Sequence, residues 1–270
     1  METKMKYTVD HDYHIHSFLS SCSRHPEQTK ENILKYAKNS GLSSICMTDH
    51  FWDEKVEGAS KWYSVQNFAH ISESLPLPED NEVKFLFGCE CDMDRHLTLG
   101  LSEERFDKFD FIVIPTTHLH MKGFTVVGDE DSSARARLWT ERFDSLLSKR
   151  LPFRKVGIAH LACTLTDPRS YEDYLVTMSL IKDTDMHDLF GIAAEKGVGI
   201  ELNASDMQCA KKNPDEIFRM FRIAKDAGCK FYLGSDSHLP EEFVGVKEIF
   251  EYAVDALGLT EEDKFRIEGI

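Results

Sequence analysis

The 270-residue sequence has no apolar run near the roughly 20 residues that a membrane-spanning helix needs, and Met1 to Asp10 do not resemble a signal peptide. It also has no internal repeat, low-complexity tract or linker rich in proline and glycine. The seven cysteines are an odd number at irregular spacings, which gives no disulfide framework. We therefore expect one cytoplasmic domain over residues 1–270, with reduced thiols and no membrane partner.

Basic residues are also scarce. There are 32 lysines and arginines against 47 acidic residues, so the formal net charge is −15 with histidine neutral. Such a charge repels phosphate backbones, which argues against a nucleic-acid partner in the absence of a strong local basic patch. A hydrophobic fraction of 41%, with 11% aromatic residues, is enough for a substantial core and excludes wholesale disorder.

Short apolar runs alternate with helical patterns along the chain. The predicted strands are Thr8–His11, Ser44–Met47, Val83–Phe87, Phe111–Pro115, Val156–Ala159, Gly199–Leu202 and Phe231–Leu233. The clearest predicted helices are Glu27–Asn39, about 134–148, His187–Glu195 and a segment capped by Asn213. Short strands without strict alternation are typical of a parallel sheet covered by helices. The pattern predicts an α/β fold, and seven strands favour a barrel or barrel-like sheet.

Residues 119–155 interrupt this rhythm between the fourth and fifth predicted strands. They contain an acidic stretch at Asp129–Asp131 and a basic run that ends at Arg137. An insertion of this length at the end of a strand is typical of a lid or a substrate-facing loop, so we expect it near the mouth of the site.

Potential metal ligands follow most of the predicted strands. They are His14, His16, His50, Glu90, His118, His160, Asp236 and His238. The strand ends of an α/β barrel all face one mouth, and residues two apart in extended chain point the same way. Imidazole and carboxylate groups bind zinc, manganese or iron, and this many donors exceeds what one ion can use. The sequence therefore predicts a centre with more than one divalent metal.

These motifs resemble those of PHP (polymerase and histidinol phosphatase) domains. In this sequence they are Asp12-x-His14-x-His16, Thr48-Asp49-His50, Gly88-x-Glu90, His118, His160 and Gly234-Ser235-Asp236-Ser237-His238. The resemblance implies a distorted seven-stranded (β/α)7 TIM-like barrel that holds three divalent ions, which could be zinc, manganese or iron. It implies a first ion on His14, His16, Glu90 and Asp236, a second on Glu90, His118 and His160, and a third on His25, His50 and His238. The Ile200–Asn203 segment and the final motif are most similar to the histidinol-phosphatase branch.

The activity that the resemblance implies is hydrolysis of a small phosphomonoester, with histidinol phosphate as one candidate. Glu90 is expected to bridge two ions because a carboxylate has an oxygen for each, and Asp236 and His238 complete the expected catalytic set. Two ions about 4 Å apart can generate a nucleophile from water and stabilise an in-line displacement at phosphorus.

Two further sets of residues are candidates around the metals. Arg169 and Arg24 are the leading candidates for holding the substrate phosphate, ahead of other basic residues such as Lys122. Asp12 and Asp49 precede ligands and are expected to accept N–H bonds from metal-bound imidazoles, with a turn-stabilising role as the alternative for Asp49.

Three other functions remain open at this point. A phosphodiesterase or exonuclease of the same family would act on a polynucleotide, which the net acidity disfavours. A metal amidohydrolase shares the H-x-H opening but normally provides a lysine bridge where this chain has Glu90. A non-catalytic metal-binding module would bind the ions without turnover.

Overall fold

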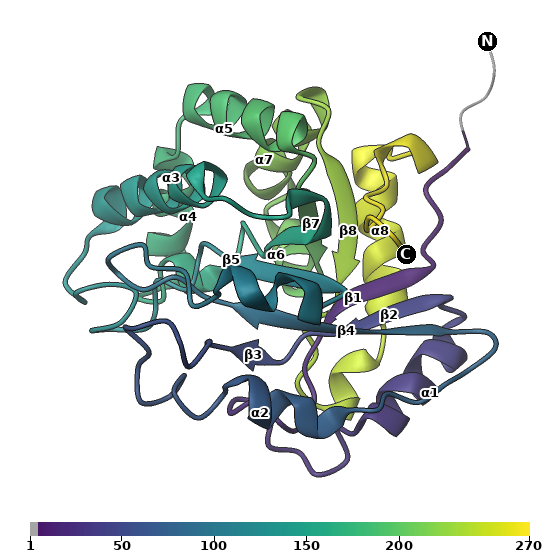
Figure 1. The fold of residues 1–270 in the computed structure, drawn as a ribbon. Coiled ribbons are helices and arrows are strands. Elements are labelled where there is room, and N and C mark those ends of the chain that lie inside the picture. The colour runs from purple at the N-terminus through teal and green to yellow at the C-terminus, as the bar shows by residue number, and fades with distance from the viewer. Residues whose placement is uncertain (1–4) are drawn as a thin grey trace.

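The computed structural model describes residues 5–270, and its centre is a parallel β-sheet (Figure 1). The strands are β1 (His11–Ile15), β2 (Ser44–Met47), β3 (His50–Phe51), β4 (Lys84–Cys91), β5 (Phe111–Pro115), β6 (Val156–Ala159), β7 (Gly199–Asn203) and β8 (Lys230–Gly234). Seven follow the order β1-β2-β4-β5-β6-β7-β8, and the two-residue β3 pairs with the far end of β4.

The two ends of this sheet meet and nearly close a barrel. The amide of His16 donates to the carbonyl of Ser237, and the amide of Asp236 donates to the carbonyl of His14. A bridge between Ile15 and Ser237 lies at the same junction. The predicted α/β barrel is therefore confirmed, and the junction lies beside two of the predicted ligand motifs.

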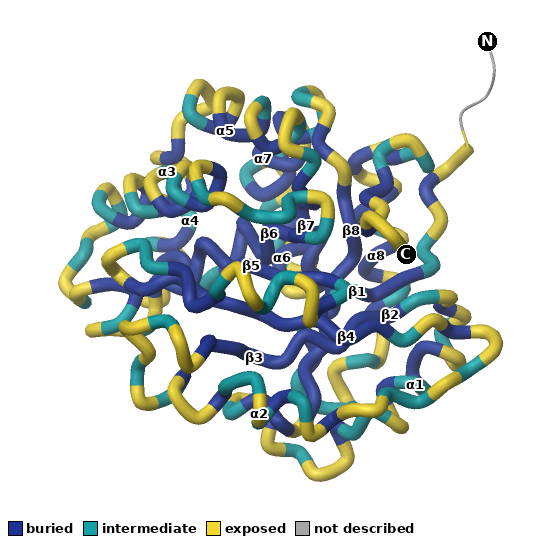
Figure 2. Tube along the Cα trace, viewed as in Figure 1, coloured by how far each residue is buried: buried dark blue, intermediate teal, exposed yellow. Residues whose placement is uncertain are grey.

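Helices cover the outside of the sheet, and in Figure 2 the strands are buried while the outward helix faces are exposed. The helices are α1 (Lys30–Ser40), α2 (Phe68–Ile71), α3 (Ser132–Ser148), α4 (Tyr171–Leu180), α5 (Asp183–Lys196), α6 (Ala204–Lys212), α7 (Pro214–Asp226) and α8 (Val246–Leu257). Among the described residues, none of these helices combines the length and apolar character of a membrane span.

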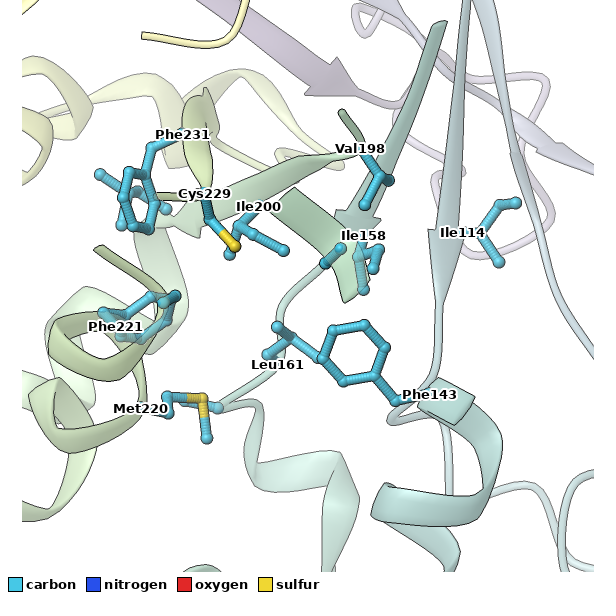
Figure 3. Close-up of a cluster of buried hydrophobic side chains, with 14 of the residues drawn as sticks. Ile114, Phe143, Ile158, Leu161, Val198, Ile200, Met220, Phe221, Cys229 and Phe231 are labelled. Atoms are coloured by element: carbon cyan, nitrogen blue, oxygen red, sulfur yellow. The ribbon is translucent and has the colours of Figure 1, made fainter. Parts of the chain in front are cut away.

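The helices begin and end where their sequences dictate. The Thr29 side chain caps α1 by accepting from the amide of Asn32, and Gly41, with a φ of 66°, ends it in the left-handed conformation. In α7 the predicted apolar stripe, which includes Met220 and Phe221, is buried against the sheet. Figure 3 shows both side chains packed in one cluster with residues of β5, β6, β7 and β8.

Several boundaries differ from the prediction. The first strand is His11–Ile15 rather than Thr8–His11, because its polar residues His11, Asp12 and His14 are buried and break the apolar pattern. The helix predicted from Glu27 begins at Lys30. Asn213 occupies the predicted N-cap position of α7, but its side chain donates to the Tyr171 hydroxyl and makes no capping bond. Helices α4, α6 and α8 were not among those predicted.

Candidate metal centre

Donor groups from six strand ends gather at one mouth of the barrel. They come from β1 (His14), the β1 loop (His16), β3 (His50), β4 (Glu90) and the loops after β5 (His118), β6 (His160) and β8 (Asp236 and His238). All but the two after β8 are buried. Among the described residues their donor atoms form three groups, each with all atoms within 4.8 Å of one another.

The first group consists of His14, His16 and Asp236. Oδ1 of Asp236 lies 3.4 Å from Nε2 of His14 and 3.1 Å from Nε2 of His16. The two Nε2 atoms are 3.3 Å apart. Ligands that each lie roughly 2 Å from one ion are spaced about 3 Å from one another, so this spacing fits a shared cation.

The second group consists of Glu90, His118 and His160. Oε1 of Glu90 lies 3.3 Å from Nε2 of His160 and 3.8 Å from Nε2 of His118. The other oxygen, Oε2, lies 3.4 Å from Nε2 of His16. The carboxylate therefore has one oxygen towards each of the first two groups, as a bridging ligand requires.

The third group consists of His16, Cys22, His50 and His238. The His16 ring lies 4.3 Å from that of His238 and 4.6 Å from that of His50, measured between centroids. His25, which was expected here, is in none of the three groups. Nδ1 of His25 accepts from the backbone amide of Glu27, and the Cys22 thiol is the donor that this loop brings to the group, so ligation by His25 stays a prediction.

The charged groups in the centre shift one another's pKa values strongly. Burial lowers the pKa of His16 and of His160. Hydrogen bonds to Asp236 and Glu90 outweigh it at His16, and a hydrogen bond to Glu90 with the charge of Asp236 outweighs it at His160, so the pKa of each is raised to about 9. The pKa of His14 is raised in the same sense by Asp236, Glu201 and Glu90. Burial alone would raise the pKa of Glu90, yet the imidazoles around it hold that pKa well below its usual range. Without a metal, protons must supply the positive charge here, and a metal would displace them.

Two buried atoms in the centre are placed as a bound cation would require. Nδ1 of His50 and Oε2 of Glu90 lie 2.8 Å apart, but within the described chain neither has a hydrogen-bond partner of acceptable geometry. Buried polar atoms without partners are costly, and they commonly mark the position of an ion. Both atoms are of the types that bind divalent metals.

Carboxylates behind the centre hold two of the imidazoles. Glu201, on β7, accepts from Nδ1 of His14 at 2.7 Å and from the amide of His160 at 2.7 Å. Asp92 lies 2.8 Å from Nδ1 of His118. Such contacts fix the tautomer that leaves Nε2 free for a metal. The role of Glu201 was missed in the sequence, although an acid in the middle of a buried strand was a usable signal.

Asp12 and Asp49 have different partners from those expected. Asp12 accepts from the backbone amide of Ser235 at 2.9 Å and from the hydroxyl of Tyr36. Asp49 accepts from the amide of Ser17 and from the hydroxyl of Ser20, which in turn contacts Nδ1 of His16. The prediction of direct imidazole contacts is corrected, because both carboxylates reach backbone or hydroxyl donors first and so fix the loops that carry the ligands.

Two donor residues have unusual backbone conformations. His160 has a φ of 31° and Asp236 a φ of 56°, both in the left-handed region that residues other than glycine rarely adopt. The amide of each is hydrogen-bonded within the site, to Glu201 and to the carbonyl of His14 respectively. Strain of this kind persists where surrounding contacts over-determine it, typically at functional sites.

A cavity of about 610 Å³ opens above the donors. Its lining comprises Cys22, His50, Ser60, Lys61, Trp62, Tyr63, Glu90, His118, His120, Met121, Lys122, Phe124, Leu165, Asp236 and His238. Part of this wall comes from the 119–155 segment, through His120, Met121, Lys122 and Phe124. A volume of this size suits a small molecule.

The basic residues of the cavity are not those favoured from the sequence. Arg169 donates to both oxygens of Asp167, at 2.8 and 2.6 Å, and is absent from the cavity lining. Arg24 donates to the carbonyl of Ser21 and is also absent from the lining. Lys61 and Lys122 line the cavity instead. Local partners hold both guanidinium groups away from the cavity lining, and their role in binding phosphate stays a prediction.

Comparison with known proteins gives consistent results. The PHP domain model matches residues 12–205. "Probable phosphatase" proteins of Thermoanaerobacter sp. (strain X514) and of Thermoanaerobacter pseudethanolicus are each 27% identical over 255 residues, covering 93% of this chain and 87% of the relative. A histidinol phosphate phosphatase of Lactococcus lactis, solved with zinc, L-histidinol and phosphate, is similar in fold with a TM-score of 0.62. That match covers 95% of this chain and 98% of the other at 15% identity.

Proposed function

This chain belongs to the PHP domain family, and we propose that it is a metal-dependent phosphatase that hydrolyses a small phosphomonoester at a centre of three divalent ions. The observation that carries the proposal is the joint geometry of the three donor groups at the floor of one cavity. The phosphatase assignment of the Thermoanaerobacter relatives supports the same reaction.

Each donor group would hold one ion. His14, His16 and Asp236 would hold the first, and Glu90, His118 and His160 the second, with Glu90 also serving the first through its other oxygen. The third would lie against His50 and His238. The donors are nitrogen and oxygen atoms suited to zinc, manganese or iron.

The bound ions would supply the Lewis acidity and positive charge that hydrolysis of a phosphate ester demands. The chain's own groups would position the substrate against them. Lys61 and Lys122 lie on the cavity wall, where their ammonium groups would attract the phosphate. Trp62 and Phe124 line the same cavity and would exclude water from the leaving group.

Histidinol phosphate is a specific candidate for the substrate. Its support is the similar Lactococcus lactis structure, which was solved with L-histidinol and phosphate. The alternative of a polynucleotide substrate is disfavoured by the net charge of −15. The cavity volume of about 610 Å³ agrees with a small ester.

The test is hydrolysis by the purified protein together with metal analysis of the same sample. The substrates are histidinol phosphate, p-nitrophenyl phosphate and a single-stranded oligonucleotide, each with added zinc, manganese or iron. We expect phosphate release from the monoesters, loss of turnover after chelation, and recovery when metal is returned. Bound metal without turnover on any monoester would support the non-catalytic module, and faster cleavage of the oligonucleotide would support the nuclease.

Variants assign the roles within the centre. Glu90→Gln should lose metal and turnover together, because it removes a carboxylate that lies between two donor groups. Lys122→Ala should raise KM more than it lowers kcat, and Lys108→Ala, on the exposed surface, is the matched control. Full metal content and wild-type turnover in Glu90→Gln would refute the bridging role.

A further inference from the structure

The third donor group contains a thiol, unlike the other two. Cys22 brings its sulfur within 4.8 Å of donor nitrogens on His16, His50 and His238. Cys22 also lines the cavity. His50 is one of these three histidines and is buried. Its Nδ1 lacks a hydrogen-bond partner of acceptable geometry among the described residues.

The loop around Cys22 is fixed on both sides. The amide of Ser21 donates to Oε1 of Gln66 at 2.8 Å, and the hydroxyl of Ser23 donates to the carbonyl of His238. The amide of Ser23 also bonds back to the carbonyl of Ser20 at 2.8 Å. Cys22 therefore does not reach the histidines by chance on a loose segment, since bonds to Gln66 and to the His238 backbone hold it there.

His25 is held in a different direction. Its Nδ1 accepts from the amide of Glu27 at 3.3 Å, and its carbonyl accepts from the amide of Gln28. These contacts tie the residue to the segment that leads into α1. Ligation by His25 through Nδ1 would break its bond with the Glu27 amide, whereas the Cys22 thiol already lies among the histidines of the third group.

We propose that Cys22 is a thiolate ligand of the third ion, together with His50 and His238, and that His25 is not a ligand. This inference rests on the metal centre of the proposed function. A sulfur ligand makes this position softer than the two built only from nitrogen and oxygen. The third position would therefore select zinc or another thiophilic ion, even where the first two accept manganese or iron.

Cobalt(II) is the probe, because thiolate ligation gives it a charge-transfer absorption in the near ultraviolet that nitrogen and oxygen ligands do not give. The metal-free protein would be titrated with cobalt as wild type, Cys22→Ser, Cys22→Asp and His25→Ala. We expect the absorption in the wild type and in His25→Ala, and its loss in both Cys22 variants. Elemental analysis of the zinc-loaded proteins should show one ion fewer per chain in Cys22→Ser and a return towards the wild-type content in Cys22→Asp.

The opposite results would overturn the inference. They are no charge-transfer absorption in cobalt-loaded wild type, its persistence in Cys22→Ser, or loss of one ion in His25→Ala with none lost in Cys22→Ser. Cys22→Asp keeps the test informative if the serine variant folds poorly, since a carboxylate can also bind the ion. Neither the cobalt absorption nor the metal content depends on turnover. A protein that shows the thiolate charge-transfer absorption but has no phosphatase activity would therefore refute the proposed reaction and leave Cys22 as a ligand.

Discussion

Glu201→Gln is a demanding test of how the centre is held together. The Glu201 carboxylate is fully buried and accepts from three donors: Nδ1 of His14, the amide of His160 and the side chain of Asn203. A glutamine has almost the same shape but only one accepting oxygen. If its oxygen serves His14, its NH2 group faces the other two donors; if its NH2 group serves His14, the ring must take the tautomer that blocks Nε2.

The expected cost follows from this conflict. A hydrogen bond to a charged group contributes about 1.5–3 kcal/mol, and about 1.4 kcal/mol corresponds to a tenfold change in affinity. We therefore expect Glu201→Gln to weaken metal binding roughly 10–100-fold, the range typical of residues that orient metal-bound histidines. Glu201 touches no substrate-facing surface, so KM at saturating metal should change much less than metal affinity.

The assay is competition for zinc against a chromophoric chelator, with circular dichroism to confirm the fold. Glu195→Gln, on the exposed side of α5, is the matched control and should bind zinc like the wild type. Wild-type zinc affinity in a folded Glu201→Gln protein would refute the claim that this carboxylate sets the orientation of the ligands.

Three further outcomes are expected. Asp92→Asn should lower the free energy of unfolding by about 3–5 kcal/mol, because it removes the carboxylate that lies 2.9 Å from the buried Arg142 guanidinium. Urea titration measures this, and a loss below about 1 kcal/mol would contradict the expectation. Burial would raise the pKa of Glu261, but Lys264 lowers that pKa to about 2. The ionised Glu261 carboxylate therefore stabilises the fold fully above its pKa in the unfolded chain, near 4.5, and this stabilisation disappears as the pH falls towards 2. Glu261→Gln should thus flatten the stability profile between these pH values, and an unchanged profile would refute the pairing. Arg169→Ala should leave KM for a phosphomonoester unchanged, since its guanidinium is bound elsewhere, whereas a raised KM would restore it as a phosphate ligand.

The barrel and most of the donors were predictable because both depend on patterns that are local in the sequence. Most strands are short apolar runs, with β1 as an exception, and parallel topology then brings groups at the strand ends, such as Glu90 and His160, to one mouth. Cys22 was not predictable in this way, because its position depends on bonds from its neighbours to Gln66 and His238, which are distant in the chain.

Basic residues were the least predictable part of the site. An arginine near a ligand motif is a candidate for binding the substrate phosphate, but its long side chain can instead donate hydrogen bonds to any acceptor nearby. Arg169 turns to Asp167, only two residues away, whereas Lys122 stays on the cavity wall. Such a choice depends on side-chain rotamers, which sequence spacing does not encode.

The left-handed backbone at His160 and Asp236 bears on how the protein matures. Each such conformation costs about 1–3 kcal/mol, and both residues belong to the groups of imidazoles and carboxylates that would hold the ions. Ions bound at these two loops would add contacts that hold both conformations, so the final ordering of the mouth would depend on metal. In metal-depleted protein we expect proteases to cut at these two loops before the rest of the barrel loosens.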